Sequence, residues 1–262
     1  MAARRLGFVG TGAITSAIVK GLATSSLKDW PVIVSPRSRE RAEELASTVA
    51  SVTVASDNQA VVDQSDIVFL AIRPQIAQDV VKSLKFRDGQ TVISLVAGMQ
   101  ATAIAALIEC RNDIVRAIPL PSVEQRACVT PIMPPNRDAA TVFSALGSTI
   151  EISDPEVFDG YVAGSAVMAT YFGFVKAAVD WLLRNGLNES DADLYLRNLF
   201  GNLGDIMRAK PELTLEELRA DHTTIGGLNE MVHTHFTKSG GPEALERGLD
   251  AVLARVRAQS NS

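Results

Sequence analysis

Short apolar runs alternate with stretches of helical periodicity over the first 150 residues of the chain. A run such as DIVFLAI, which is apolar almost throughout, is typical of a strand that is covered on both faces of a sheet. Helical patterns of about 10–15 residues separate the runs, and this alternation predicts a mostly parallel sheet with right-handed crossover connections. The predicted strands are residues 5–10, 32–35, 52–55, 66–72, 91–98, 113–119 and 127–134.

Beyond residue 150 the apolar spacing is helical to the end of the chain. Ser153 and Glu156 stand three residues apart with Pro155 between them, which is typical of the start of a helix. Thr214 and Glu217 repeat this spacing and predict a second capping box. An α/β part is therefore predicted to precede an all-α part.

Composition and charge exclude several classes of partner. Of the 262 residues, 47% are hydrophobic and 21% are charged, which is typical of a soluble globular protein. The net charge of −5 gives no reason to expect nucleic acid or an anionic membrane as a partner. No uncharged apolar run reaches the roughly 18–20 residues of a membrane span. The two cysteines, Cys110 and Cys128, favour a reducing compartment over a disulfide framework, so we expect a cytoplasmic protein.

The segment FVGTGAITSAI places two glycines where the first predicted strand meets the first predicted helix. Gly10 allows a tight turn there, and Gly12, which has no Cβ, lets a pyrophosphate approach the backbone. The helix that begins at Ala13 and Ile14 would offer its N–H groups and its positive dipole end to the phosphates. Thr15 stands in place of a third glycine. The motif predicts dinucleotide binding, with a plain tight turn between strand and helix as the alternative.

The end of the second predicted strand indicates which dinucleotide binds. NAD-binding domains usually carry Asp or Glu there to hold the ribose 2′-OH. The segment VIVSPRSRER has no carboxylate at the strand end and carries Ser35, Arg37 and Ser38, with Arg39 and Arg41 close by. Hydroxyl and guanidinium groups match a 2′-phosphate through charge-assisted hydrogen bonds. We therefore predict NADP(H) as the cofactor, and the alternative is an arginine loop that is merely solvated.

Together these features predict two domains. A Rossmann-type NADP-binding domain is expected over residues 1–152, and a helical domain over residues 153–262. The long apolar stretches at 161–184 and 191–208 would expose large hydrophobic patches on a single copy. We therefore expect a homodimer that forms through the C-terminal helices.

The chain resembles the pyrroline-5-carboxylate reductase family along essentially its whole length. The segments that carry this resemblance are, in order, GFVGTGAITSAIVKGL, VIVSPRS, DIVFLAIRPQ, VISLVAGM, KAAVDWLLRNGLNESDADLYLRNLFGNLGDIM and HTTIGGLNEM. That family reduces a cyclic imine that carries a carboxylate to proline, by passing a hydride from NAD(P)H to the carbon of the C=N bond. The resemblance implies an intertwined dimer whose active sites lie between the cofactor domain and the helices.

The resemblance also implies roles for residues at the carboxyl ends of two further predicted strands. Four of them would line the nicotinamide side of the site: Ala71, Ile72, Arg73 and Pro74. Arg73 stands where a lysine is usual in the family. Val96, Ala97 and Gly98 would flank the same pocket.

The substrate residues implied by the resemblance lie in the second half of the chain. Thr224 matches the threonine that hydrogen-bonds the ring nitrogen, and its alternative role is to cap the helix at residue 225. Thr223, Gly226 and the backbone N–H groups around residues 223–227 would cradle the carboxylate at a helix start.

Three segments depart from the family's pattern, and all three belong to its substrate site. The family's S-P-G-G reads here as Arg219, Ala220, Asp221 and His222. Its M-P-N-T-P reads as IPLPS, so Leu120 and Pro121 stand at positions that would contact substrate, and its S-G-S-G-P-A-Y reads as GSAVMAT. Because the polar groups of a site must match those of its ligand, these departures indicate an altered substrate.

His222 is a second candidate catalytic residue. Imidazole groups in general serve as proton donors or pair with carboxylates, and the alternative is a histidine on a surface loop. Imine reduction asks the protein mainly to hold the nicotinamide about 3–3.5 Å from the acceptor carbon, because the cofactor carries the hard step. The other histidines, His233 and His235, do not share a helix face, so no metal site is predicted.

Other functions remain open at the level of the sequence. The departures also suit NADPH-dependent reduction of a different imine or a carbonyl, or a non-catalytic NADP-binding module that senses redox state. The β-hydroxyacid dehydrogenases share the architecture and use a helical lysine followed one turn later by an asparagine. Here Lys176 lies too far from Gly160 and Gly164, and position 180 is Asp, which weakens that interpretation.

Overall fold

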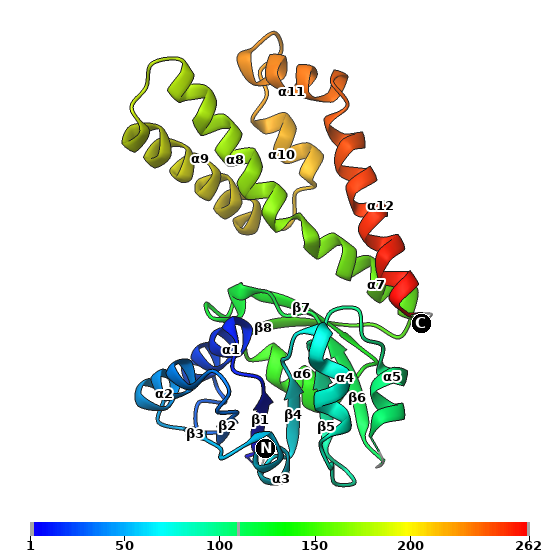
Figure 1. Ribbon diagram of the computed structural model, residues 1–262. Helices are drawn as coiled ribbons and strands as arrows, with labels where there is room; N and C mark the ends of the chain where they lie inside the picture. The colour runs from blue at the N-terminus through cyan, green and yellow to red at the C-terminus, as the bar shows by residue number, and fades with distance from the viewer. Residues whose placement is uncertain (1–2, 109–110, 261–262) are drawn as a thin grey trace. The chain divides into compact units, whose positions relative to one another are not determined.

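The structure of the protein is a computed structural model that describes residues 3–108 and 111–260. Cys110 lies outside the described residues. The chain divides into two compact units (Figure 1), of which the first comprises Met1–Val162 with Leu253–Ser262 and the second comprises Ala163–Val252.

The first unit is built on an 8-stranded sheet with the order β3-β2-β1-β4-β5-β6-β7-β8 (Figure 1). Neighbouring strands run parallel except for β6 and β7, which are antiparallel. The strands are β1 (Leu6–Val9), β2 (Val32–Val34), β3 (Val52–Val54), β4 (Ile67–Leu70), β5 (Thr91–Ser94), β6 (Asp113–Ala117), β7 (Cys128–Met133) and β8 (Gly147–Glu151). The predicted α/β class with a mostly parallel sheet is confirmed.

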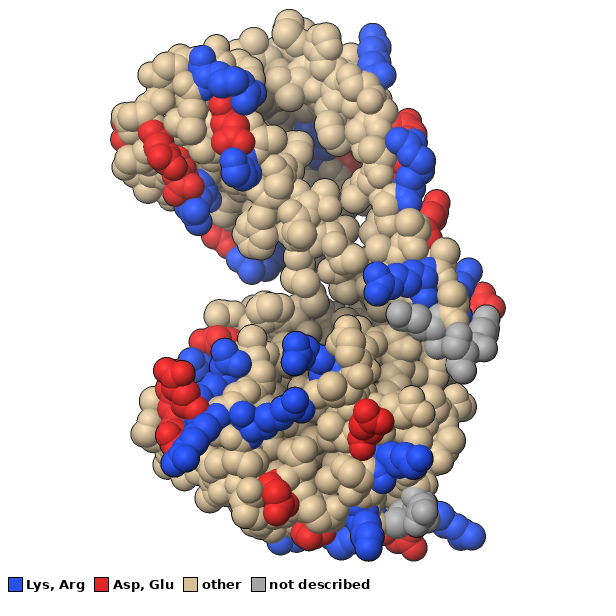
Figure 2. Space-filling view, in the orientation of Figure 1, with Lys and Arg blue, Asp and Glu red and all other residues tan. Residues whose placement is uncertain are grey.

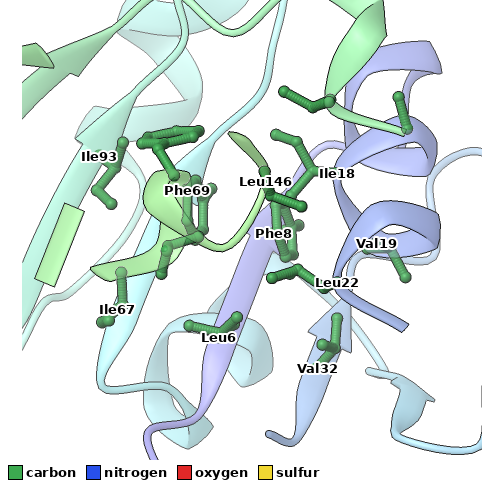
Figure 3. Packing of buried hydrophobic residues seen from close by; sticks show 14 of the residues in the cluster. Leu6, Phe8, Ile18, Val19, Leu22, Val32, Ile67, Phe69, Ile93 and Leu146 are labelled. Atoms are coloured by element: carbon green, nitrogen blue, oxygen red, sulfur yellow. The ribbon is translucent and has the colours of Figure 1, made fainter. Parts of the chain in front are cut away.

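Helices cover both faces of this sheet. One face packs against α1 (Ala13–Ala23), α2 (Arg39–Thr48) and α6 (Arg137–Ser144), and the other against α3 (Asn58–Gln64), α4 (Pro74–Lys82) and α5 (Ala101–Leu107). Figure 3 shows the first of these cores, in which Phe8 stacks on Phe69 with ring centroids 4.5 Å apart. Phe143 of α6 meets Phe69 edge-on. Burial of both faces is why the central strands are continuously apolar in sequence.

The helix α7 (Pro155–Gly164) begins where the sequence predicted a helix start. The capping residue differs from the predicted one, because the Oδ1 of Asp154 accepts the N–H of Glu156 at 2.8 Å. The prediction that Ser153 caps this helix is therefore wrong, since the carboxylate one residue later takes that role.

The division between the units lies inside α7, ten residues beyond the predicted boundary between residues 152 and 153. Phe158 is 1% exposed and packs with Met133 and Ile152 in a third buried cluster. These contacts seat the first part of α7 on the sheet, so it belongs to the first compact unit. The assignment of residues 1–152 and 153–262 to separate functional domains stays a prediction.

The second unit is helical, as predicted. Its helices are α8 (Met168–Arg184), which follows the short 3-10 turn η2 (Ser165–Val167), α9 (Glu189–Ala209), α10 (Leu215–Asp221), α11 (Leu228–Lys238) and the first part of α12 (Gly241–Ser260). Phe200 of α9 meets both Tyr171 and Phe174 of α8 edge-on. The capping box of Thr214 and Glu217 at the start of α10 is confirmed by reciprocal hydrogen bonds.

The helical stretch Pro155–Arg184 has 30 residues and is long and apolar enough to cross a membrane by length and composition alone. Only 6% of its most apolar window is buried within the chain. The search for uncharged runs did not identify this stretch, because Lys176 interrupts it. Lys176 pairs with Asp180 one turn later at 2.7 Å. The apolar side chains that α8 and α9 expose include Phe172, Phe174, Trp181, Leu194 and Tyr195. An exposed apolar surface of this size marks a contact site.

Candidate functional site

The predicted cofactor residues follow the carboxyl ends of four parallel strands. The register pairs β1 with β2 and with β4, and β4 with β5, so the loops after these strands meet at one edge of the sheet. This edge is where open α/β sheets bind nucleotides. The structure therefore brings together the glycine turn, the arginine loop and the two segments assigned to the nicotinamide.

The turn after β1 requires glycine at one position and leaves space at another. Gly10 has φ of +104°, and a Cβ built there would lie 2.3 Å from the carbonyl oxygen of Ala71. Gly12 is the N-cap of α1, and a Cβ built on it would meet no atom within 4 Å. The backbone at Gly12 is therefore open to the approach of a ligand.

Thr15 stands at the position where the motif usually has a third glycine. Its side chain is fully buried, and its hydroxyl donates to the carbonyl oxygen of Gly10 at 2.7 Å. Within residues 3–108 and 111–260, the N–H groups of Gly12, Ala13 and Ile14 have no acceptor. These amides and the positive end of α1 suit a diphosphate.

Ser35 contacts the glycine turn from the end of β2. It is fully buried at the end of β2, and its hydroxyl oxygen accepts the N–H of Gly10 at 3.0 Å. Thr11 completes the contact by donating from its hydroxyl to the Ser35 carbonyl oxygen at 2.6 Å. The sequence assigned Ser35 to the 2′-phosphate, but this hydroxyl is enclosed and braces the glycine turn against β2.

The basic loop after β2 remains accessible. Arg37 is exposed, and Ser38 is the N-cap of α2, with no hydrogen bond from its side chain to the helix backbone. Arg41 reaches back to the Thr11 carbonyl oxygen at 3.5 Å, whereas Arg39 is paired with Glu43 along α2. Figure 2 shows Lys and Arg side by side with acidic residues over the region of α1 and α2. Arg37 and Arg41 are therefore the cations that best suit a 2′-phosphate.

The loops after β4 and β5 flank the glycine turn. The N–H of Ala71 continues the pairing of β4 with β1 by donating to the Val9 carbonyl oxygen at 2.9 Å, and the Ile72 side chain lies beside Gly10. Arg73 is the N-cap of α4 and Pro74 its first residue. After β5 the chain turns over residues 96–99, with Ala97 exposed and Gly98 at φ of +75°.

The segment that replaces the family's asparagine and threonine lies after β6, which is parallel to β5. Leu120 packs against the first buried core, and its N–H points to the Cys128 sulfur at 3.4 Å. Pro121 begins a 3-10 turn, η1 (Pro121–Val123), that approaches α1 so closely that a Cβ on Gly21 would lie 2.2 Å from the Val123 carbonyl oxygen. This segment is packed mainly by apolar contacts and has lost the polar groups of the family's pattern.

The other predicted substrate residues share one turn of the second unit, between α10 and α11. The Thr223 hydroxyl donates to the Arg219 carbonyl oxygen at 2.6 Å. The Thr223 N–H donates to the Ala220 carbonyl oxygen. His222 places Nδ1 2.8 Å from the Leu218 carbonyl oxygen. Because a carbonyl only accepts, Nδ1 carries the proton in that bond and Nε2 is left as the second functional nitrogen.

Glu230 occupies part of the predicted carboxylate cradle, and sequence reasoning did not identify it. Gly226 has φ of +74°, and its N–H donates to the Glu230 Oε2 at 2.6 Å. The Gly227 N–H donates to the Thr224 carbonyl oxygen at 2.8 Å. In the part of the chain that the structure describes, the Thr224 hydroxyl has no hydrogen-bond partner. The turn therefore offers the Thr224 hydroxyl to a ligand. Its Gly226 N–H is already bound by the Glu230 carboxylate at the start of α11.

No cluster of three or more His, Cys, Asp or Glu side chains suited to a metal ion occurs among the described residues. The open backbone at Gly12 and the exposed Arg37 suit anion binding along the strand ends of the first unit. The chemistry that the second unit supports is hydrogen bonding from a threonine and a histidine.

Comparison with known proteins bears on this arrangement. A family model described as NADP oxidoreductase, coenzyme F420-dependent, matches residues 5–98. The pyrroline-5-carboxylate reductase of Vibrio alginolyticus is 23% identical over 97% of this chain and 96% of its own length. The resemblance to the pyrroline-5-carboxylate reductases is confirmed.

Solved structures of pyrroline-5-carboxylate reductases have the same fold. The enzyme from Coxiella burnetii superposes with a TM-score of 0.84 at 22% identity, covering 98% of this chain and 99% of the other. The Plasmodium falciparum pyrroline carboxylate reductase, solved with NADP bound, gives a TM-score of 0.78 at 18% identity and covers 99% of each chain. The similarity thus includes both compact units and not the nucleotide-binding half alone.

Proposed function

We propose that this chain is an NADPH-dependent oxidoreductase that reduces the C=N bond of pyrroline-5-carboxylate to give proline. The observation that carries the proposal is similarity to pyrroline-5-carboxylate reductases over 97% of the chain, which is a similarity of both halves in order. The glycine turn supports it, because its open backbone at Gly12 and its unpaired amides suit a dinucleotide phosphate.

The first unit would hold the cofactor through three groups of residues. Gly10, Gly12, Ala13 and Ile14 would bind the diphosphate through backbone N–H groups and the N-terminus of α1. Arg37, Arg41 and the Ser38 hydroxyl would bind the 2′-phosphate. The nicotinamide side would be formed by Ala71, Ile72, Arg73, Pro74, Ala97 and Gly98. The cofactor supplies a hydride to the carbon of the C=N bond when it is bound.

The second unit would orient the substrate and handle its proton. The unpartnered Thr224 hydroxyl would hydrogen-bond the ring nitrogen of the imine and orient its C=N bond. The Nε2 of His222 is the chain's candidate for holding the proton that ends on nitrogen, since Nδ1 is fixed on a backbone carbonyl. The Thr223 hydroxyl is not free to bind the substrate, because it donates to the Arg219 carbonyl oxygen. Thr223 would act only through its position in the turn.

The protein would act as a homodimer formed through α8 and α9. A groove of about 620 Å³ lies between these helices, and its lining combines apolar side chains such as Tyr171, Val175 and Phe200 with charged ones such as Lys176 and Arg197. The exposed apolar surface of the stretch Pro155–Arg184 is explained if a second copy covers it. The reaction partner is a small imine, and the acidic net charge of −5 supports neither nucleic acid nor an anionic membrane as a partner. We place the reaction in the cytoplasm, which suits a chain with two cysteines.

The proposal is tested by following NADPH absorbance with pyrroline-5-carboxylate as substrate and by measuring the proline formed. We expect one proline for each NADPH consumed. Thr224→Val keeps the size of the side chain and should lower kcat/KM about tenfold to a hundredfold, as loss of a hydrogen bond to the reacting group does. Thr237→Val on α11 is the matched control and should retain activity. Equal activity of the two variants would remove Thr224 from the mechanism.

A second candidate function is reduction of an imine that carries no carboxylate. The observation that favours it is the contact between the Glu230 carboxylate and the Gly226 N–H, which places a negative charge in the predicted carboxylate cradle. Assay of neutral cyclic imines beside pyrroline-5-carboxylate decides between the two. A higher kcat/KM for a neutral imine would establish this second function.

A further inference from the structure

Arg116 lies at the carboxyl end of β6, where its register partner on β5 is Ser94. Its side chain is 4% exposed, and its Nη1 donates to the Oδ1 of Asp159 at 3.3 Å. The same nitrogen donates to the Oε1 of Gln100 at 2.8 Å. The guanidinium carbon lies 4.5 Å from the centre of the Phe158 ring. One buried cation therefore contacts two other elements, α7 and the start of α5.

A buried ion pair of this kind is a weak source of stability. The loss of hydration of two charges offsets most of their attraction, and apolar side chains of similar size are often as stable or more so. Burial lowers the pKa of Arg116, and the Asp159 carboxylate opposes that effect. What this pair offers beyond an apolar contact is direction, because a planar guanidinium holds its partners at fixed angles.

Gln100 connects Arg116 to the proposed cofactor site. It is the N-cap of α5 and ends the turn that carries residues 97–98. The turn is closed by a hydrogen bond from the Met99 N–H to the Val96 carbonyl oxygen at 3.5 Å. A hydrogen bond of that length is weak. The bond from Arg116 to Gln100 therefore adds a restraint at the far end of this turn.

Asp159 connects the same guanidinium to α7 within the first unit. The neighbouring Phe158 packs with Met133 and Ile152, so this part of α7 is fixed on the sheet by apolar contacts as well. Arg116 thus joins the turn after β5 to a helix that cannot shift without disturbing a buried cluster.

We propose that Arg116 is a positioning residue for hydride transfer, which holds the turn at residues 97–98 through Gln100 and is itself anchored by Asp159. The inference rests on the proposed function, because that function assigns the turn to the nicotinamide side. Loss of the guanidinium would displace the nicotinamide without preventing the cofactor from binding. A displacement of about 1 Å at such a site costs about a hundredfold in rate.

The test uses Arg116→Met and Asp159→Leu, separately and together, in the full chain. Arg4→Met is the control, because Arg4 forms an ion pair with Asp138 at 3.0 Å elsewhere in the same unit. We expect Arg116→Met to lower kcat about tenfold to a hundredfold, with KM for NADPH changed by less than about twofold. The kinetic isotope effect with NADPH deuterated at C4 should rise, because hydride transfer becomes slower than product release. A changed KM with unchanged kcat would overturn the inference.

The double variant separates positioning from stability. Apolar replacement of both partners should restore the thermal midpoint that either single variant loses, while kcat stays low. Recovery of both the midpoint and kcat would overturn the inference. Gln100→Leu leaves the ion pair of Arg116 and Asp159 intact. It therefore tests the inference even if the single variants at those two positions do not fold. It should lower kcat as well, and a wild-type kcat in this variant would also overturn the inference.

The fluorescence of bound NADPH gives a readout that needs no substrate. The emission reports the surroundings of the nicotinamide, and we expect Arg116→Met to change it while Arg4→Met does not. Identical emission from the two variants would overturn the positioning role. If Arg116→Met changes the emission while the wild-type protein reduces no imine, the result would count against the proposed function alone.

Discussion

At the scale of single residues, the glycine turn is held from both sides by hydroxyl groups. Thr15 donates to the Gly10 carbonyl oxygen and Ser35 accepts the Gly10 N–H. These bonds explain how the chain keeps a tight turn with a threonine where a third glycine is common. They also explain why the Ser35 hydroxyl is enclosed instead of facing the cofactor.

Gly10 and Gly12 are expected to respond differently to the same substitution. Gly10→Ala places a Cβ 2.3 Å from the Ala71 carbonyl oxygen at φ of +104°, so it should lower the free energy of unfolding by about 1–3 kcal/mol. Gly12→Ala has space for its Cβ and should leave stability nearly unchanged. It should weaken NADPH binding about tenfold or more, because the methyl group occupies the approach to the backbone. Urea denaturation and calorimetry measure the two effects, and a reversed pattern would contradict the assignment.

Glu230 is expected to weaken the binding of a carboxylate substrate. Its carboxylate accepts the Gly226 N–H at 2.6 Å, where the carboxylate of the imine is predicted to bind. Glu230→Gln removes the negative charge and should lower KM for pyrroline-5-carboxylate about twofold to fivefold, the range of an exposed charge interaction. A cyclic imine without a carboxylate is the control, and its KM should not move. An equal change for both substrates would show that charge at Glu230 is not the cause.

At the scale of elements, periodicity predicted the strands that are buried on both faces and the long helices of the second half. It did not identify α3, α6 or β8. The helices are short, and their signals were single capping residues, Asp57 for α3 and Asn136 for α6. β8 lies at the edge of the sheet and is only partly buried, so its sequence GSTIE has little apolar character.

The candidate site was predictable where backbone geometry determines the residue, as at Gly10 and Gly12. Roles that depend on the hydrogen-bond partners of a side chain could not be predicted from the spacing of residues in the sequence. The hydroxyl of Ser35 is an example, because its partner is the N–H of Gly10, 25 residues earlier in the sequence. The carboxylate of Glu230 is another, because its contact with the Gly226 N–H depends on how the chain turns between the two residues. Arg116 also gave no signal, since its partners Gln100 and Asp159 come from separate elements.

The capping box of α10 gives a pH dependence with a definite sign. Hydrogen bonds from the Thr214 N–H, and then from its hydroxyl, lower the pKa of Glu217. A lowered folded-state pKa means that this stabilisation is complete above the ordinary glutamate pKa of about 4.3 and is lost as the pH falls through the folded value. Glu217→Gln should therefore lower the thermal midpoint at pH 7 and have a smaller effect in acid, where the wild-type carboxyl group is itself protonated. Glu246→Gln on α12 is the control, and a Glu217→Gln deficit that is constant with pH would contradict the box.

At the scale of the whole molecule, the exposed apolar surface of α8 and α9 predicts self-association. Sedimentation should give twice the chain mass of 28.0 kDa. Phe172→Glu, at a position 70% exposed on α8, should shift the protein toward the monomer. Val129→Glu, at a position 53% exposed on β7, is the control and should leave the mass unchanged. A monomeric wild-type protein at micromolar concentration would contradict the dimer.

The central claim is that this chain transfers a hydride from NADPH to the C=N carbon of pyrroline-5-carboxylate. The direct measurement is mass spectrometry of the product formed with NADPH that carries deuterium at the transferred C4 position. The account predicts proline with one deuterium, bonded to the carbon of the former C=N bond. NADPH consumption without deuterated proline, or no consumption at all, would contradict it.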